Sequence, residues 1–351
     1  VLIGMSGGVD SSVAAALLKE QGYHVIGATM RLWTYSDSCN MKHEGCCAES
    51  AVEDARRVCD KLGIDFYVMN FKDMFKDKVV DYFVDEYIHG RTPNPCIACN
   101  KYLKFDALLK KALAMGIDYV ATGHYAKIEK GEDGKYILRA SEAVKKDQSY
   151  VLYNFTQEQL AHTLMPLGGY NKDWVRQKAE ELGLGVAHKP DSQEICFVED
   201  DDYAKFITDY SGYEPKEGDI LDVNGNVIGK HRGLIYYTIG QRKGIGAYGR
   251  PMFVMKIDAE NNTITLGEKG MEFSNELTAY DVNFVSGEFP KENMLITAKV
   301  RYQAPPAAAM LCPQKDGTVK LMFPEPQRAV TPGQAVVFYD GDIVLGGGTV
   351  L

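Results

Sequence analysis

Long apolar runs are missing from this chain of 351 residues, and no stretch approaches the roughly 18 apolar residues that a membrane span requires. No signal peptide is recognisable near the first residue. Positive net charge is also missing: the formal net charge of −9 excludes an overall basic coat for nucleic acid. A local basic face stays compatible with this charge, because binding depends on where the charges lie. We therefore expect a cytoplasmic protein with no membrane partner.

A disulfide framework of the secreted type is missing as well. The eight cysteines are irregularly spaced, whereas small secreted domains carry them densely. Cysteines of this kind are more often buried, catalytic or metal-bound. The length predicts two or three domains, and the hydrophobic and charged fractions of 45% and 25% are those of an ordinary globular protein.

Strands and helices are predicted to alternate over the first 200 residues. The expected strands lie near 1–5, 24–30, 65–70 and 117–124. The expected helices lie near 11–21, 48–62, 72–89, 100–115, 156–163, 171–183 and in the run EDDDYAKFITDY. This βαβα order predicts an α/β fold with a doubly wound parallel sheet that helices cover on both faces.

The predicted secondary structure changes after about residue 211 from alternating strands and helices to short strands. Turn pairs such as NG and DG then separate short alternating runs, which predicts two small β-rich modules. We expect a catalytic domain at 1–208, a central β-rich RNA-binding module at 209–272 and a C-terminal β-barrel at 273–351.

The run SGGVDSS joins the first strand to the first helix. Gly7 and Gly8 permit positive φ and close backbone approach, so successive N–H groups and the helix N-terminus can cradle an anion. Asp10 and the two serines after it can cap the helix or reach phosphate or its Mg²⁺. The run fits neither G-x-x-x-x-G-K-S/T nor G-x-G-x-x-G. An ordinary Gly-rich turn is the alternative, but the order strand, loop, helix favours phosphate binding.

Two cysteines about a hundred residues apart suggest chemistry. Cys99 precedes Asn100, the expected N-cap of the helix near 100–115, and lysines follow closely. A thiol in that position should have a lowered pKa. Cys196 lies in the apolar run ICF after a polar loop. Without a secretory context, the two suggest a redox-active pair that meets in the fold, and two buried core cysteines are the alternative.

Several stretches carry a resemblance to known families. SGGVDSS resembles the PP-loop of the ATP pyrophosphatases, which include amide ligases and RNA thiolases. Over essentially the whole chain, longer stretches resemble the tRNA-specific 2-thiouridylases, the MnmA/TrmU family. These stretches are GRTPNPCIACNKYLKF (90–105), KPDSQEICF (189–197), ATGHYA (121–126), KKDQSYVLY (145–153), YYTIGQRKGIG (236–246), VRYQ (300–303) and the terminal GGGT.

The resemblance implies ATP-dependent 2-thiolation of the wobble uridine of tRNA. A persulfide on Cys196 would deliver the sulfur to an adenylated C2 position, with Cys99 as the catalytic partner. ATP and Mg²⁺ would be required, and a cysteine desulfurase or sulfur-relay protein would supply the sulfur. The implied nucleotide contacts are Gly4, Met5, Ser6, Gly7, Gly8, Val9, Asp10, Ser11, Met30 and Gly123. The implied tRNA contacts are Asn94, Pro95, Cys96, His124, Lys146, Asp147, Gln148, Arg301, Tyr302 and Gln334.

Position 96 departs from the family pattern, because many members carry Asp where this chain has Cys96. A thiol moves a proton less readily than a carboxylate, so the resemblance does not carry general acid–base catalysis over to this position. The change creates Cys96-x-x-Cys99, which together with Cys196 could hold zinc or an iron–sulfur cluster with one open site. The cluster is an alternative to the persulfide chemistry.

The remaining cysteines have simpler interpretations. A second candidate zinc set lies in SCNMKHEGCC, although adjacent cysteines cannot easily ligate one tetrahedral metal. Its members are Cys39, His43, Cys46 and Cys47. We expect Cys59 in the core and Cys312 to pack in a β module.

Residues 230–250 contain no acidic residue and form the candidate RNA surface. Basic side chains with interleaved aromatics suit phosphates and splayed bases, while a solvated β-hairpin is the alternative. The residues are Lys230, His231, Arg232, Tyr236, Tyr237, Arg242, Lys243, Tyr248 and Arg250. Since a wobble base must leave its stack to expose C2, we expect a base-flipping pocket near Asn94.

Two other functions stay open. Another PP-loop enzyme, either an amide ligase or a thiolase for a different RNA position, would use the same loop. A ligase would have no use for Cys99 and Cys196. A non-catalytic iron–sulfur or RNA-binding protein could keep the loop without turnover.

Overall fold

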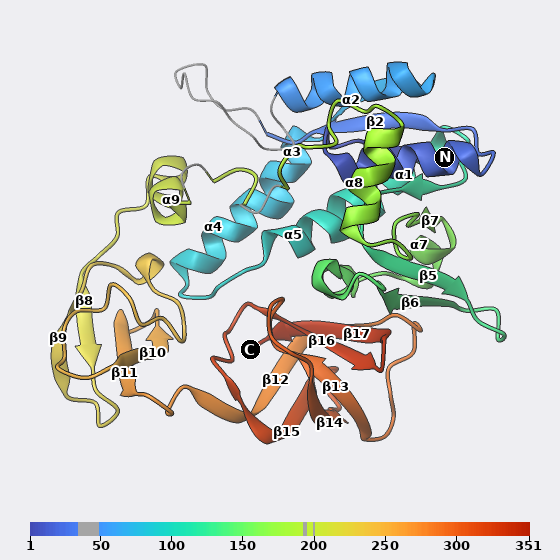
Figure 1. Ribbon diagram of the computed structural model, residues 1–351. Coiled ribbons are helices and arrows are strands. Elements are labelled where there is room, and N and C mark those ends of the chain that lie inside the picture. Colours follow the sequence, from blue (N-terminus) through green and yellow to red (C-terminus); the bar gives the residue numbers. More distant parts are fainter. Residues whose placement is uncertain (34–48, 192–194, 199–200) are drawn as a thin grey trace.

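The computed structural model describes residues 1–33, 49–191, 195–198 and 201–351, which form three parts along the chain (Figure 1). The candidate zinc set between Cys39 and Cys47 lies outside the described residues. No helix in the described ranges is long and apolar enough to cross a membrane.

A five-stranded sheet with order β3-β2-β1-β4-β7 forms the first part, and every pair in it is parallel. The strands are β1 (Leu2–Gly4), β2 (Ile26–Arg31), β3 (Asp65–Asn70), β4 (Val120–Ala121) and β7 (Thr163–Leu164). The strand order reverses between β1 and β4, and ligands bind parallel sheets at such a switch point, outside the carboxyl ends of the strands. The predicted doubly wound fold is confirmed.

Helices cover both faces of this sheet, because successive strand residues point to opposite sides. Leu2 packs into one core cluster and Ile3 into another. The Ile3 side is covered by α1 (Val9–Glu20), α2 (Glu49–Leu62) and α8 (Lys172–Glu181). The Leu2 side is covered by α3 (Lys72–Phe75), a π-helical turn (Lys76–Val80), α4 (Asp81–Ile88) and the helix of Cys99. Two further helices are α7 (Gln157–Ala161) and α9 (Tyr203–Ser211).

The helix that carries Cys99 begins earlier than predicted. It runs through α5 (Pro95–Ala98), a π-helical stretch (Cys99–Ala107) and α6 (Leu108–Ala114). Asn94 is its N-cap, since its side-chain oxygen accepts the backbone N–H groups of Cys96 and Ile97. Asn100 is buried, and its amide donates to the carbonyl of Val151 instead. The expectation that Cys99 lies at a helix N-terminus is therefore wrong, and Cys96 occupies the first turn.

Two β-rich parts follow, as predicted. The central sheet has the order β10-β11-β8-β9. Its strands are β8 (Gly218–Leu221), β9 (Val227–His231), β10 (Met252–Asp258) and β11 (Thr263–Glu268). In the last part, β12 pairs with both β15 and β17, which closes a six-stranded barrel. Its strands are β12 (Phe273–Phe284), β13 (Met294–Lys299), β14 (Ala307–Pro313), β15 (Val319–Arg328), β16 (Ala335–Asp340) and β17 (Ile343–Val350).

A hairpin of β5 (Ala126–Lys130) and β6 (Tyr136–Ala140) interrupts the alternation in the first part. It extends the barrel sheet, because β6 pairs with β17 where Arg139 faces Ile343. The sequence analysis missed this hairpin, although the Asp-Gly pair at its turn is a recognised signal. The eight-stranded sheet of the barrel thus contains two strands from the first part, and the two parts lie side by side (Figure 1).

Candidate functional site

Hydrogen bonds from serine side chains at the start of α1 stabilise the loop between β1 and α1. The Ser11 and Ser12 hydroxyls both donate to the carbonyl of Gly8, at 3.2 and 2.8 Å. Gly8 is the N-cap of α1 and no side chain caps the helix, so the predicted capping by Asp10 or the serines does not occur. Gly7 has φ +70°, and a Cβ there would lie 2.2 Å from the carbonyl oxygen of Ala51. The first N–H groups of α1 are thus available for an anion.

The predicted nucleotide contacts come from the carboxyl ends of three neighbouring strands. Gly4 ends β1 and leads into the loop, Met30 lies near the end of β2, and Gly123 follows β4. Gly123 lies directly against the loop, since a Cβ there would be 2.7 Å from the backbone N of Ser11. Val9 and Met5 are buried behind the loop. The fold therefore gathers residues 4–11, 30 and 123 at one edge of the sheet.

A charged network surrounds Asp10. Lys172, the first residue of α8, binds both carboxylate oxygens of Asp10 at 2.8 Å and one oxygen of Asp191 at 2.7 Å. The Tyr125 hydroxyl donates to Asp10 at 2.7 Å. Burial raises the pKa of Asp191, but the hydrogen bonds from Lys146 and Lys172 outweigh it and hold the pKa below its ordinary value. The Asp191 carboxylate is thus ionised at neutral pH.

A second lysine ties the same segment to the loop. Lys189 donates to the carbonyl oxygen of Gly7 at 3.1 Å and pairs with Asp54 of α2 at 2.9 Å. The sequence analysis did not single out Lys189, Asp191 or Lys172. The first two lie inside the quoted run KPDSQEICF, whereas Lys172 carried no signal of its own.

The two cysteines expected to meet lie in one hydrophobic cluster. Cys99 is 8% exposed and belongs to the core on the Leu2 side of the sheet. Cys196 is partly buried and packs against the same cluster, next to the buried Phe197. Cys59 is a core residue as predicted, and burial raises the pKa of its thiol to about 12. Cys312 lies partly buried on β14.

No group of three or more His, Cys, Asp or Glu side chains in the described part of the chain is placed to hold a metal ion. Cys96, Cys99 and Cys196 all lie in that part. Their arrangement therefore gives no support to the alternative zinc or iron–sulfur site. Cys96 itself is exposed, in contrast to the buried Cys99.

The structure brings together several residues that the resemblance assigns to tRNA. The Tyr302 hydroxyl, from the barrel, donates to the backbone carbonyl of Asp147 at 3.1 Å. Burial, Asp147 and Cys96 raise the pKa of Tyr302, so these side chains share one neighbourhood. Lys146 pairs with Asp191 at 2.7 Å and connects this neighbourhood to the charged network of the loop. Candidate base contacts and the nucleotide loop are therefore adjacent.

Other members of the predicted tRNA set have structural partners. Gln148 accepts the backbone N–H of Tyr125 at 3.0 Å, and the Asp147 carboxylate accepts from Ser141 and Ser149. Arg301 donates weakly to the carbonyl of Arg328 at 3.4 Å, and Gln334 donates to that of Thr92 at 2.8 Å. Pro95 is buried in the first turn of its helix.

His124 lies just beyond β4, beside the candidate site. Its Nδ1 lies 2.7 Å from the Thr122 hydroxyl, and its ring lies 5.8 Å from that of Phe105. Burial and the charge of Lys104 hold the pKa of His124 well below its usual value, although part of the residue stays accessible. The ring is therefore neutral at physiological pH and can accept or donate a hydrogen bond.

The basic stretch 230–250 is only partly available for RNA. His231 and Tyr237 are buried, and His231 binds backbone groups through both ring nitrogens. Lys230 pairs with Asp219 and Arg250 with Glu268. Arg232 stacks 4.1 Å over the ring of Tyr236. Arg242 and Lys243 are exposed, make no ion pair with a described residue and line a shallow hollow together with Gln241. They are the best placed cations for a phosphate.

Models of known families match the three parts of the chain. Residues 1–200 match the tRNA methyl transferase HUP domain. Residues 204–268 match the tRNA methyl transferase PRC-barrel domain. Residues 274–350 match the aminomethyltransferase β-barrel domain. These matches follow the order of the parallel-sheet part, the central sheet and the barrel.

Curated proteins are similar to this chain over its whole length. A tRNA-specific 2-thiouridylase MnmA from Acetivibrio thermocellus is 60% identical, with 100% of this chain and 98% of that protein covered. Proteins of the same name from Clostridioides difficile and Clostridium botulinum are 58% and 57% identical, each with 100% of this chain and 97% of the relative covered. This chain belongs to the tRNA-specific 2-thiouridylase family.

Proposed function

We propose that this protein catalyses the ATP-dependent 2-thiolation of the wobble uridine of tRNA. The observation that carries the proposal is the attachment of the segment leading to Cys196 to the phosphate-binding loop. Lys189 binds the loop carbonyl of Gly7, and Asp191 shares Lys172 with Asp10. Cys196, five residues beyond Asp191, would thereby deliver its sulfur close to the cradle in which uridine is activated. The names of the relatives point to the same reaction.

Activation would take place at the loop after β1. The C2 oxygen of uridine attacks the α-phosphorus of ATP, the bond to the β-phosphate breaks, and pyrophosphate leaves. The N-terminal N–H groups of α1 suit the anionic phosphates, and Gly123 permits close approach on the other side. Mg²⁺ would accompany the phosphates. Because Lys172 holds both oxygens of Asp10, phosphate oxygens would supply most ligands of the ion.

Sulfur transfer would follow from the cysteine pair. The terminal sulfur of a Cys196 persulfide attacks C2, and AMP leaves with the former C2 oxygen. The Cys99 thiolate then attacks the Cys196 sulfur, which breaks the S–S bond to the new thiocarbonyl and forms a Cys99–Cys196 disulfide. This disulfide holds the two oxidising equivalents, so an external thiol reductant must reopen it. A cysteine desulfurase or sulfur-relay protein would renew the persulfide.

Binding of tRNA would use the neighbourhood of Tyr302 together with the central module. Tyr302, Asp147 and Lys146 lie beside Cys96. Asn94 caps the helix that carries Cys96 and Cys99. Arg242 and Lys243 offer exposed positive charge for the RNA backbone. The flipped wobble base would lie between these groups and the loop. We also propose domain bounds of 1–208, 209–272 and 273–351. The first junction falls in the last turn of α9, and the second falls between β11 and β12.

Nucleoside mass spectrometry tests the proposal. The protein is incubated with ATP, Mg²⁺, a persulfide donor and unmodified tRNA, and the digest is searched for 2-thiouridine at the wobble position. We expect product with wild type, none with Cys196→Ala, and unchanged product with Cys312→Ser, which changes a cysteine of the barrel remote from the cluster. Pyrophosphate release should persist in Cys196→Ala, because activation precedes sulfur transfer.

The same experiment separates the alternatives. A methylated nucleoside formed from S-adenosylmethionine would support the reaction named in the family-model descriptions instead. If the wild type forms no 2-thiouridine and the Cys99→Ser, Cys196→Ser double variant releases pyrophosphate as fast as the wild type, the result would point to an amide ligase. Visible absorbance together with bound iron in anaerobically purified protein would support the alternative in which Cys96, Cys99 and Cys196 hold an iron–sulfur cluster. Normal thiolation by Cys196→Ala would contradict the persulfide route.

A further inference from the structure

The helix that carries Cys96 and Cys99 starts where all three parts of the molecule meet. Asn94 caps it by accepting the N–H groups of Cys96 at 3.1 Å and Ile97 at 3.3 Å. Residues 90–94 connect α4 to this cap, so the place of the first helical turn depends on how the connection is held.

The barrel holds the connection through its loop 331–334. The backbone N–H of Thr92 donates to the carbonyl of Pro332 at 2.9 Å, and the side-chain amide of Gln334 donates to the carbonyl of Thr92 at 2.8 Å. Both backbone polar groups of Thr92 thus bind the barrel. Gly333 has φ +86°, and a Cβ there would lie 3.0 Å from the Thr92 N. The connection and the barrel loop are therefore packed as closely as a glycine allows.

The central module holds the same connection from another side. A Cβ at Gly90 would lie 2.6 Å from Cγ2 of Ile257, at the end of β10. The Thr92 hydroxyl lies 3.4 Å from the hydroxyl of Thr238. The barrel and the central module, which both offer candidate RNA contacts, thus contact residues 90–94. These residues precede the helix that carries Cys96 and Cys99, called the catalytic helix below.

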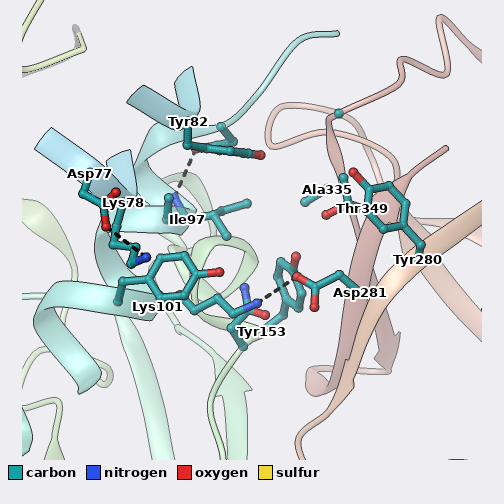
Figure 2. Close-up of a pocket in the computed structure, with 15 residues that line it drawn as sticks. Asp77, Lys78, Tyr82, Ile97, Lys101, Tyr153, Tyr280, Asp281, Ala335 and Thr349 are labelled. Atoms are coloured by element: carbon teal, nitrogen blue, oxygen red, sulfur yellow. Dashed lines mark hydrogen bonds and ion pairs between the residues drawn. The ribbon is translucent and has the colours of Figure 1, made fainter. Parts of the chain in front are cut away.

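Farther along, a cavity of about 420 Å³ separates the helix from the barrel (Figure 2). Lys101 of the helix reaches across it and pairs with Asp281 of the barrel at 2.8 Å (Figure 2). The helix residues that line the cavity are Asn94, Ile97, Ala98, Lys101 and Tyr102. Cys99 is not among them and packs in the core on another face. Contacts across the cavity therefore act on the cysteines through the helix and not on the reacting atoms.

We propose that the barrel loop 331–334 is a positioning element for the catalytic helix. By binding Thr92 it fixes the Asn94 cap, and the cap sets where Cys96 and Cys99 lie relative to the nucleotide loop. Gln334 is then a positioning residue as well as a candidate RNA contact. Binding of RNA to the barrel is thereby coupled to the positions of Cys96 and Cys99 through the short connection before the helix. The proposal rests on the proposed function.

Two alanine substitutions in the barrel test this coupling. Gly333→Ala adds a methyl group against Thr92 at φ +86°, whereas Gly317→Ala adds one at φ +84° with nothing within 4 Å. Both variants carry the same backbone strain, so the contact is the difference between them. We expect kcat for thiolation to fall about tenfold or more in Gly333→Ala relative to Gly317→Ala, with equal KM for tRNA. Equal kcat values in the two variants would overturn the proposal.

A second measurement does not depend on thiolation. The rate at which iodoacetamide alkylates Cys96, followed by mass spectrometry without ATP or RNA, reports the geometry of the first turn. We expect Gly333→Ala to change this rate about twofold or more, and Gly317→Ala to leave it unchanged. If wild type forms no 2-thiouridine but the alkylation rates differ, the proposed function fails and the positioning role stands. If thiolation occurs but neither kcat nor alkylation separates the variants, the positioning role fails alone.

Discussion

Replacing Gly123 by alanine would place a methyl group against the backbone of the nucleotide loop. The added Cβ would lie 2.7 Å from the backbone N of Ser11 and 2.8 Å from the carbonyl carbon of Asp10. Ordinary contact begins near 3.4 Å, so the loop or the end of β4 must move by about 0.7 Å. Gly123 has no left-handed φ, and the effect is therefore one of contact and not of backbone strain.

The size of the effect follows from the cost of overpacking, which is about 1–3 kcal/mol. If the loop moves, this cost appears as weaker nucleotide binding, and KM for ATP rises by about fivefold to 150-fold. If the sheet yields instead, the melting temperature falls by about 2–4 °C for each kcal/mol. We expect most of this free-energy cost to appear as a higher KM for ATP, because the N-terminal N–H groups of α1 form the nucleotide cradle.

The assay is pyrophosphate release as a function of ATP concentration in the presence of tRNA, together with thermal unfolding. Gly185→Ala is the matched control, since a Cβ there meets nothing within 4 Å and its φ is not left-handed. An unchanged KM in Gly123→Ala, at an unchanged melting temperature, would show that this loop does not cradle the nucleotide.

Two further sets of substitutions test the charged network around Asp191 and the exposed cations of the central module. Lys172→Met removes a cation from Asp191, whose pKa burial raises but the bonds from Lys146 and Lys172 hold below its ordinary value. The stability that this lowered pKa contributes is fully present above the ordinary, unfolded-state pKa of about 4 and is lost as pH falls through the folded-state pKa. The melting temperature of Lys172→Met should therefore be lower than that of wild type near pH 7, and the difference should shrink as pH falls below about 4. A difference that does not change with pH would contradict this. The Arg242→Ala, Lys243→Ala double variant should weaken tRNA binding and reduce the slope of log K against log salt by about 0.7–0.9 per charge. Lys256→Ala, which removes a lysine paired with Asp258, is its control, and equal slopes would exclude this surface.

Local patterns in the sequence were enough to predict the elements of the first part and the β-rich character of the rest. The predicted strand at 65–70 coincides with β3, and the predicted helix at 48–62 ends at the same residue as α2. Such elements follow from hydrophobic period and turn residues, which act over a few positions. The phosphate loop was visible for the same reason, because strand, glycines and helix are contiguous.

The start of the helix that carries Cys99 depended on a choice between two asparagines, which the neighbouring Pro95 and the packing of Asn100 decided together. Both Asn94 and Asn100 suit an N-cap, but Asn94 has Pro95 in the favoured next position. Asn100 is instead buried by the turn that contains Val151. Cys99 therefore lies inside the helix, and its reactivity has to be explained by its core neighbours rather than by the helix terminus.

The remaining parts of the site join residues far apart in the chain, which no local pattern specifies. Lys172 meets Asp10 over a separation of 162 residues, and Gln334 meets Thr92 over 242. The motifs by themselves were enough to predict the chemistry, because the candidate reacting groups lie in short runs of sequence that can be recognised locally. The tertiary structure alone decided which cations neutralise the loop carboxylate and which barrel residues hold the catalytic helix, since those contacts form only when sheet, helices and barrel pack together.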